Sequence, residues 1–232
     1  MKARDLIAVY DDLLAHYGSR HWWPADTPFE VMIGAVLTQN TAWTNVERAL
    51  DRLRAVAALE PRAIAALPVN VLADALRPAG YYNVKERRLR ALCAWVIEQG
   101  GVEALQERET GALRAALLSV HGVGPETADD IVLYAFGRPV FVIDAYTRRL
   151  FARLGFVRGQ ETYEDLRARF ERALPPDAAL YNEYHALIVQ HAKMVCRTKP
   201  VCDTCLLRAC CPARQSLGRQ GRKTRSLDRK RV

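Results

Sequence analysis

The chain of 232 residues is half hydrophobic by composition and long enough to bury a sizeable core in one or two domains. It contains no run of 18 apolar residues, and its first residues lead directly into an amphipathic helix, so neither a membrane span nor a secretory signal is expected. The formal net charge is +8, and residues 212–232 hold eight Lys/Arg and one Asp, so the rest of the chain is nearly neutral. This basic tail is predicted to be disordered, and it could either attract nucleic acid or be an inert solvated segment.

Apolar residues recur at helical spacing along most of the chain. Helices are predicted at 5–17, 28–37, 42–56, 61–67, 69–76, 83–97, 125–135, 145–154, 162–174 and 177–195, with a further helix that ends shortly before residue 121. Strand-like alternation is convincing nowhere. The predicted fold class is therefore all-α, built from about ten short helices.

Three tryptophans lie where this helical pattern is interrupted. Trp22 and Trp23 fall in a loop after the first helix, and Trp43 follows a polar interruption that contains Gln39 and Asn40. Aromatic side chains in such places are candidates for a binding site, but they can equally be ordinary core or interface residues. The polar pair can likewise be simple loop residues.

A glycine-spaced turn joins two predicted helices near the middle of the chain. Its glycines permit backbone conformations that other residues avoid, and the proline that follows suits the first turn of a helix. The backbone N–H groups of such a turn can bind a phosphate, although a tight connection between helices is the simpler interpretation. The residues of this candidate hairpin are His121, Gly122, Val123, Gly124 and Pro125.

An apolar run at residues 139–143 ends on a single acid, Asp144. A carboxylate that a buried segment places near a phosphate-binding turn suggests chemistry on a nucleic acid. The alternative is structural, because Asp144 also precedes a predicted helix and can cap its first turn by accepting N–H hydrogen bonds.

Five of the six cysteines crowd into the sixteen residues that follow the last long helix. The spacing Cys196-x5-Cys202-x2-Cys205-x5-Cys211 could serve zinc, disulfides or an iron–sulfur cluster, although nothing else indicates an oxidising compartment. Cys210 stands beside Cys211 and is the alternative to it as a fourth ligand.

In their order and spacing, the hairpin, the aspartate and the cysteine loop resemble the endonuclease III superfamily of helix–hairpin–helix DNA glycosylases, over nearly all of residues 5–211. Within this superfamily, four motifs are most similar to the type III 3-methyladenine DNA glycosylases. They are WWP at 22–24, GAVLTQNT at 34–41, RPAGYYN at 77–83 and GVGPETAD at 122–129.

The resemblance implies a [4Fe–4S] cofactor. Endonuclease III enzymes carry this cluster on a Cys-x6-Cys-x2-Cys-x5-Cys loop, which the present loop matches within one residue. The implied ligands are Cys196, Cys202, Cys205 and Cys211, and the one-residue deletion keeps Cys210 open as an alternative to the last. Type III enzymes can lack this loop, so the chain combines features of two branches.

The resemblance also bears on strand cleavage. Bifunctional endonuclease III enzymes carry a lysine 18 residues before the aspartate, and this lysine attacks C1′ of the sugar. Here the 18th residue before Asp144 is Glu126. A carboxylate cannot form a Schiff base, so a monofunctional glycosylase without AP-lyase activity is implied. Asp144 would stabilise an oxocarbenium-like sugar and orient or deprotonate the attacking water.

A pocket for a base flipped out of double-stranded DNA is implied as well. The candidates to line the pocket or to fill the gap left by the base are Trp22, Trp23, Gln39, Asn40, Trp43 and Lys193. Electron-rich indole rings attract a cationic 3- or 7-alkylated purine, whose glycosidic bond is already weakened. The expected substrate is therefore an alkylated purine. The alternatives are a monofunctional pyrimidine or mismatch glycosylase, or a catalytically weak DNA-binding relative.

Two helical domains with a cleft between them are expected. One spans 21–137 and ends in the hairpin; the other combines 1–20 with 138–211, including the cysteine loop; residues 212–232 form the tail. The protein is expected to be a cytoplasmic monomer, associated with the nucleoid if it is bacterial, that binds damaged DNA and no membrane.

Overall fold

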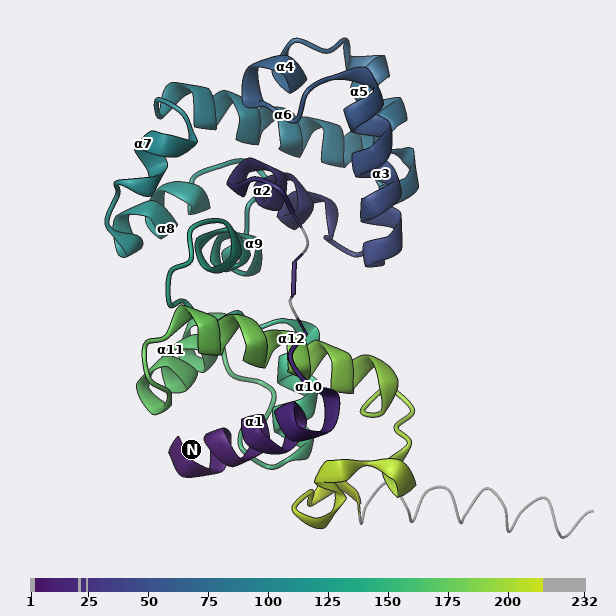
Figure 1. Ribbon diagram of the computed structural model, residues 1–232, viewed down its shortest axis with the longest axis vertical. Helices are drawn as coiled ribbons and strands as arrows, with labels where there is room; N and C mark the ends of the chain where they lie inside the picture. The colour runs from purple at the N-terminus through teal and green to yellow at the C-terminus, as the bar shows by residue number, and fades with distance from the viewer. Residues whose placement is uncertain (1–2, 21, 24, 215–232) are drawn as a thin grey trace, which may run out of the picture. The chain divides into compact units, whose positions relative to one another are not determined.

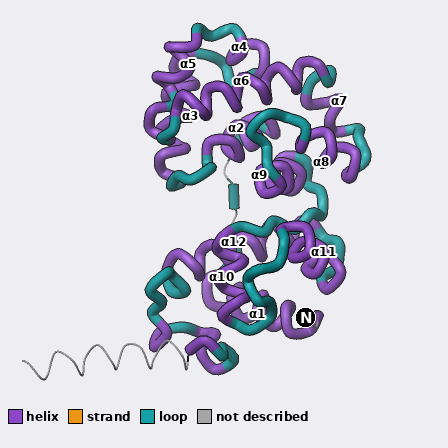
Figure 2. The backbone as a smooth tube through the Cα atoms, turned by 180° about the vertical axis from the view of Figure 1, so that it is seen from behind, coloured by secondary structure: helices purple, strands orange, loops and turns teal. Residues whose placement is uncertain are grey.

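The structure is a computed structural model that describes residues 3–20, 22–23 and 25–214 (Figure 1). Helices and loops make up these ranges, and no strand occurs within them (Figure 2). The predicted all-α fold class is therefore confirmed. None of the described helices combines the length and the apolar character that a membrane crossing requires. Most of the predicted basic tail, residues 215–232, lies outside the described residues.

The chain divides into two compact units, of which unit 2 is the continuous segment Trp23–Val140. Its helices are α2 (Pro28–Leu37), α3 (Trp43–Val56), α4 (Pro61–Ala65), α5 (Val69–Ala75), η1 (Arg77–Ala79), α6 (Tyr82–Glu98), α7 (Val102–Gln106), α8 (Thr110–Leu118), α9 (Pro125–Asp130) and η2 (Ile131–Ala135). α2 is buried from Phe29 to Leu37 and packs against α6 and η2, while α6 also packs against α4 and α5 (Figure 1). The apolar stretch 31–37 of α2 thus forms the centre of this unit.

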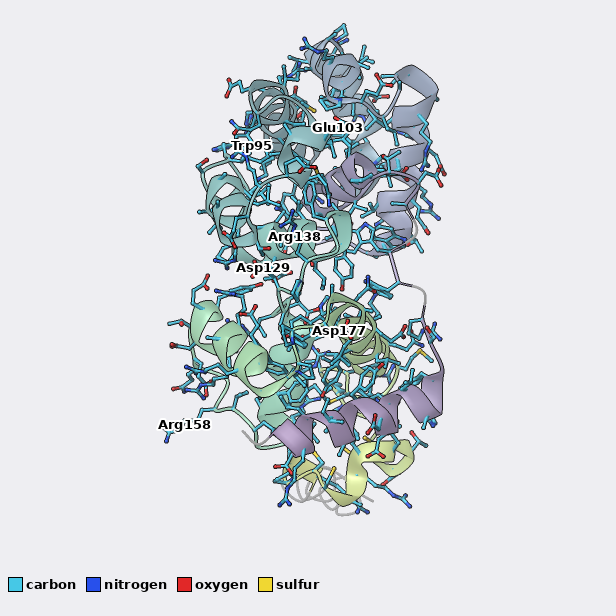
Figure 3. The ribbon with its side chains drawn as sticks, turned by 60° about the vertical axis from the view of Figure 1, so that its left-hand side comes forward. Trp95, Glu103, Asp129, Arg138, Arg158 and Asp177 are labelled. Atoms are coloured by element: carbon cyan, nitrogen blue, oxygen red, sulfur yellow. The ribbon has the colours of Figure 1, made fainter. Side chains whose placement is uncertain are left out.

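Unit 1 consists of Met1–Trp22 and Phe141–Val232. Its helices are α1 (Ala3–Tyr17), α10 (Ala145–Arg153), α11 (Tyr163–Ala173), α12 (Ala178–Met194), η3 (Cys202–Thr204) and η4 (Leu206–Ala209). α12 packs against α1 and α10, and its N-terminus is capped by Asp177, whose carboxylate accepts from two backbone N–H groups (Figure 3). Stacked and edge-on rings fill the core, among them Phe141 on Phe170 with centroids 4.5 Å apart.

Two local features differ from the sequence prediction. The helix predicted at 125–135 is α-helical only to Asp130 and continues as the π-helical segment η2, a geometry often found at functional sites. The short helix α7 is not predicted, because five residues span too few turns to show an apolar periodicity. The other predicted helices are present, with ends shifted by a few residues.

Candidate active site and cysteine loop

Asp144 is the N-cap residue of α10 and is only 8% exposed. Its Oδ1 atom accepts a hydrogen bond of 2.7 Å from the backbone N–H of Thr147. The capping role that the sequence suggested is therefore real. It leaves Oδ2, the second carboxylate oxygen, outside the cap, so capping and chemistry do not exclude one another.

His185 of α12 faces this second oxygen. Its Nε2 atom lies 3.5 Å from Oδ2 of Asp144, and the side chain is buried. Burial acts to raise the pKa of Asp144, but hydrogen bonding to His185, the charge of His185 and the Thr147 N–H outweigh it, so the pKa lies below its ordinary value. Asp144 is therefore an anion at neutral pH. Sequence reasoning missed His185, because it lies on a different helix among apolar residues.

The two glycines of the hairpin between α8 and α9 differ in what they require. Gly122 has φ +86°, and a Cβ there would lie 2.2 Å from Cγ of Arg88, so another residue would displace that side chain. Gly124 has φ −93° and ψ 178°, an extended conformation that any residue adopts, and a Cβ there would meet nothing within 4 Å. Of the two glycines, Gly122 alone uses the conformational freedom that glycine permits.

The remaining hairpin residues lie as their sequence suggests. Val123 is buried in the core of unit 2, and His121 is exposed. Pro125 opens α9 as its first residue, which confirms the predicted helix start. Glu126 is exposed in the first turn, where an acid complements the helix dipole.

Gln39 ties the turn after α2 to this hairpin. Its Nε2 donates to the carbonyl oxygen of Gly122 at 3.0 Å and to Oγ1 of Thr127 at 2.9 Å, while its Oε1 accepts from Arg88. Gln39 could fill a base gap only by giving up these bonds. Its neighbour Asn40 is exposed, has a left-handed φ of +54°, and makes no side-chain hydrogen bond within the part of the chain that the structure describes. Of the two, Asn40 has the freer side chain.

Trp23 and Trp43 belong to an aromatic cluster in unit 2. The ring of Trp23 stacks on Tyr134 of η2 with centroids 4.7 Å apart and meets Trp43 edge-on at 5.2 Å. Gly34 of α2 makes room for them, because a Cβ there would lie 3.3 Å from the Trp23 ring. Two of the predicted pocket tryptophans are thus brought together, with Tyr134 as a third partner that the sequence analysis missed.

Trp22 belongs to unit 1, where it faces Lys193 of α12. The Lys193 ammonium lies 5.6 Å from the centroid of the Trp22 ring and 5.9 Å from that of Tyr146, so it makes cation–π contacts with both. Tyr146 was not predicted, although its place two residues after Asp144 could have indicated it. The sequence candidates Trp22 and Lys193 are therefore neighbours.

The cysteine loop follows the end of α12, and no disulfide joins the cysteines of the described residues. Burial, and then the proximity of Cys211 and Cys196, raises the pKa of Cys202. Burial is also the main cause that raises the pKa of Cys205, with contributions from Cys196, Cys211 and Cys202. Each of the four sulfurs in the sequence pattern is thus within electrostatic reach of others.

Cys210 stands apart from this group. Its Sγ lies 3.3 Å from the carbonyl oxygen of Leu207, and its pKa is raised by burial with a further contribution from one cysteine, Cys211. In the described residues, no three or more His, Cys, Asp or Glu side chains converge on one position for a single ion.

Two arginines of α10 bind the start of the cysteine loop. Arg153 donates from Nη1 to the carbonyl oxygen of Cys196 at 3.1 Å and to its Sγ at 3.3 Å, and Arg149 donates from Nε to the same carbonyl at 2.8 Å. α10 therefore carries Asp144 at its N-terminus, and Arg153 at its C-terminus binds the start of the cysteine loop.

A family model described as "HhH-GPD superfamily base excision DNA repair protein" matches residues 33–176. The chain belongs to this superfamily. The match includes the hairpin and Asp144, and it ends before Lys193 and the cysteine loop. The HhH-GPD chain is also 47% identical, over 206 residues that cover 88% of it and 94% of the relative, to a Methanocaldococcus jannaschii protein provisionally named a DNA repair glycosylase.

Solved structures of glycosylases share the HhH-GPD fold. A non-covalent complex of endonuclease III with DNA has a TM-score of 0.81 at 24% identity and covers 94% of this chain and 99% of that chain. The H. pylori 3-methyladenine DNA glycosylase MagIII, bound to 1,N6-ethenoadenine, has a TM-score of 0.71 at 28% identity and covers 83% and 98%. The helix–hairpin–helix glycosylase fold expected from the sequence is therefore confirmed.

Proposed function

We propose that this HhH-GPD protein is a monofunctional DNA glycosylase that hydrolyses the N-glycosidic bond of an alkylated purine flipped from double-stranded DNA. The observation that carries the proposal is Asp144, a buried anionic carboxylate with one oxygen fixed by Thr147 and the other beside His185. Membership of a base excision repair superfamily supports the reaction class. The similarity to a 3-methyladenine DNA glycosylase supports an alkylated purine as the substrate.

The reaction requires a negative charge that is already in place. As the base leaves, positive charge develops on the sugar, and an oriented carboxylate lowers the energy of that state. Oδ1 of Asp144 is committed to the helix cap, so Oδ2 would face the sugar or accept the proton of the attacking water. His185 beside Oδ2 would keep this oxygen in place and help it remain charged.

Excision without strand cleavage is supported by Glu126. The resemblance to endonuclease III places the sugar-attacking lysine at this position. The exposed carboxylate found here has no amine to attack C1′. Its place in the first turn of α9 suits a residue that stabilises the helix terminus.

Two groups of aromatic side chains support an alkylated purine as the substrate. In unit 1, Trp22 and Tyr146 offer electron-rich rings, which would attract a cationic alkylpurine once it displaces the Lys193 ammonium that contacts them. In unit 2, the cluster of Trp23 and Trp43 offers further ring surface. Asn40 rather than Gln39 would fill the gap left by the base.

The cysteine loop would hold a [4Fe–4S] cluster through Cys196, Cys202, Cys205 and Cys211. Such a cluster, when bound, supplies one-electron redox chemistry and cross-links the segment that carries its ligands. No step of base excision is assigned to it. The two units would correspond to the two domains expected from the sequence, in a protein that acts as a monomer.

The test is a screen of the purified protein over duplexes that contain 3-methyladenine, 7-methylguanine, 1,N6-ethenoadenine, uracil, thymine glycol or a mismatch. We expect release of the free alkylated purine, strand breaks only after alkali or heat, and no covalent adduct after borohydride treatment. A robust adduct would contradict the absence of lyase activity. Release of a pyrimidine or a mismatched base would show that the substrate is not an alkylated purine. Tight binding without release would indicate a catalytically weak relative.

A further inference from the structure

A buried line of polar groups connects α1 to the cysteine loop. The hydroxyl oxygen of Tyr17 lies 2.9 Å from Nδ1 of His191, and Nε2 of the same ring lies 3.6 Å from Sγ of Cys205. His191 is 0% exposed, so both of its ring nitrogens find their partners inside the protein. No sequence motif indicates this connection, because Tyr17 and Cys205 lie near opposite ends of the chain.

The direction of these hydrogen bonds depends on the state of Cys205. A neutral imidazole carries one N–H, and a thiolate can only accept. If Cys205 is a thiolate ligand, Nε2 of His191 must carry the proton and donate to sulfur, and Nδ1 must accept from the Tyr17 hydroxyl. If Cys205 is a thiol, its S–H donates to Nε2 of His191, and Nδ1 carries the ring proton and donates to the Tyr17 oxygen. The ring keeps one proton in both cases, and the thiol proton leaves to solvent on ligation.

We infer that Tyr17 and His191 form a buried hydrogen-bond relay that orients the sulfur of Cys205 and determines how firmly the chain retains its iron–sulfur cluster. This inference rests on the cluster named in the proposed function. An N–H donor aimed at a bound thiolate orients the ligand and withdraws charge from sulfur, which raises the reduction potential. The Tyr17 hydroxyl fixes the tautomer that presents this donor, so its effect reaches the sulfur through His191.

The relay can be tested with a matched pair of substitutions on α1. Tyr17→Phe removes the hydroxyl that faces His191, whereas Tyr10→Phe removes a hydroxyl from the same helix at a ring that packs edge-on to Tyr184. Both proteins are purified anaerobically as full-length chains, and their helical content is compared by circular dichroism. Iron per chain, the rate of iron loss to a chelator and the reduction potential are then measured.

We expect Tyr17→Phe to lose iron roughly tenfold faster than the wild type, because outer hydrogen-bond partners typically account for 10–100-fold in metal affinity. Its reduction potential should move to more negative values, and Tyr10→Phe should match the wild type in both measurements. His191→Phe should have at least as large an effect, and adding Tyr17→Phe to it should change nothing further. These readouts do not depend on glycosylase activity.

Two results would overturn the relay, and they can be told apart. Equal rates of iron loss and equal reduction potentials for Tyr17→Phe and Tyr10→Phe would contradict the relay but not the presence of the cluster. A wild-type protein without iron, or with zinc in its stead, would remove the cluster of the proposed function and the relay with it.

Discussion

Nε2 of His185 lies 3.5 Å from Oδ2 of Asp144, on the side of the carboxylate that the helix cap leaves free. The aspartate is thus supported from two helices: its own helix α10, through the Thr147 N–H, and α12, through His185. A carboxylate held from both sides keeps its orientation before any substrate arrives, so little reorganisation is needed in the transition state.

The first prediction concerns the charge of Asp144. Asp144→Asn keeps the shape and much of the capping ability but removes the negative charge. Excision should fall by about a hundredfold or more, on the order of 3 kcal/mol, while DNA binding changes little. Asp177→Asn is the matched control, since Asp177 caps α12 in the same unit and should be dispensable for turnover. Near wild-type excision by Asp144→Asn would reduce Asp144 to a helix cap.

The second prediction concerns acid stability. Because the folded-state pKa of Asp144 is lowered, the stabilisation from its ionised form is fully present above the unfolded-state pKa of about 4 and is lost as the pH falls through the folded value. The difference in free energy of unfolding between the wild type and Asp144→Asn should therefore change below about pH 4, where the Asp144 carboxylate takes up its proton. Urea unfolding of both proteins at a series of pH values measures it. A difference that stays the same between about pH 5 and about pH 2 would be incompatible with the lowered pKa.

Most of the fold could be predicted because its signals are local. The buried helix α2 shows in an uninterrupted apolar run, and the start of α9 shows in Pro125. Asp144 could be singled out because a buried segment and a helix start meet at that one residue. Such signals require only neighbouring residues in the sequence.

What sequence reasoning missed depends on contacts between distant segments. His185 has an ordinary place on an apolar helix, and only the packing of α12 against α10 brings it to Asp144. Gln39 looks like a free polar loop residue until the hairpin supplies the Gly122 carbonyl as its partner. The conformations of Gly122 and Gly124 were also beyond sequence reasoning, since a glycine in a motif does not reveal its own φ.

The third prediction separates the two adjacent cysteines. Cys211→Ser should lose the iron and the brown colour near 400 nm, because its sulfur belongs to the group that includes Cys202 and Cys205. Cys210→Ser should retain both, because Cys202 and Cys205 are influenced by Cys211 and Cys196 and not by Cys210. Iron analysis and absorption spectra of the two anaerobically purified variants decide the matter. The reverse pattern would make Cys210 the fourth ligand.

The last prediction compares alanine substitutions at the two hairpin glycines by their effect on stability. Gly122→Ala should destabilise the protein by about 1–3 kcal/mol, because it combines a left-handed backbone with a clash against Arg88. Gly124→Ala should leave stability unchanged or raise it by up to about 1 kcal/mol, because its backbone is extended and a Cβ meets nothing there. Urea unfolding gives both values.

DNA binding provides a further test of Gly124. If a phosphate approaches the open side of Gly124, Gly124→Ala should weaken binding to damaged and undamaged duplexes alike, because backbone contacts to phosphate position a protein without reading the base. A salt titration of binding, compared with the unchanged stability of this variant, separates lost contact from lost fold. Wild-type binding by Gly124→Ala would mean that the turn is only a tight connection between α8 and α9, and that DNA affinity must come from other surfaces of the chain.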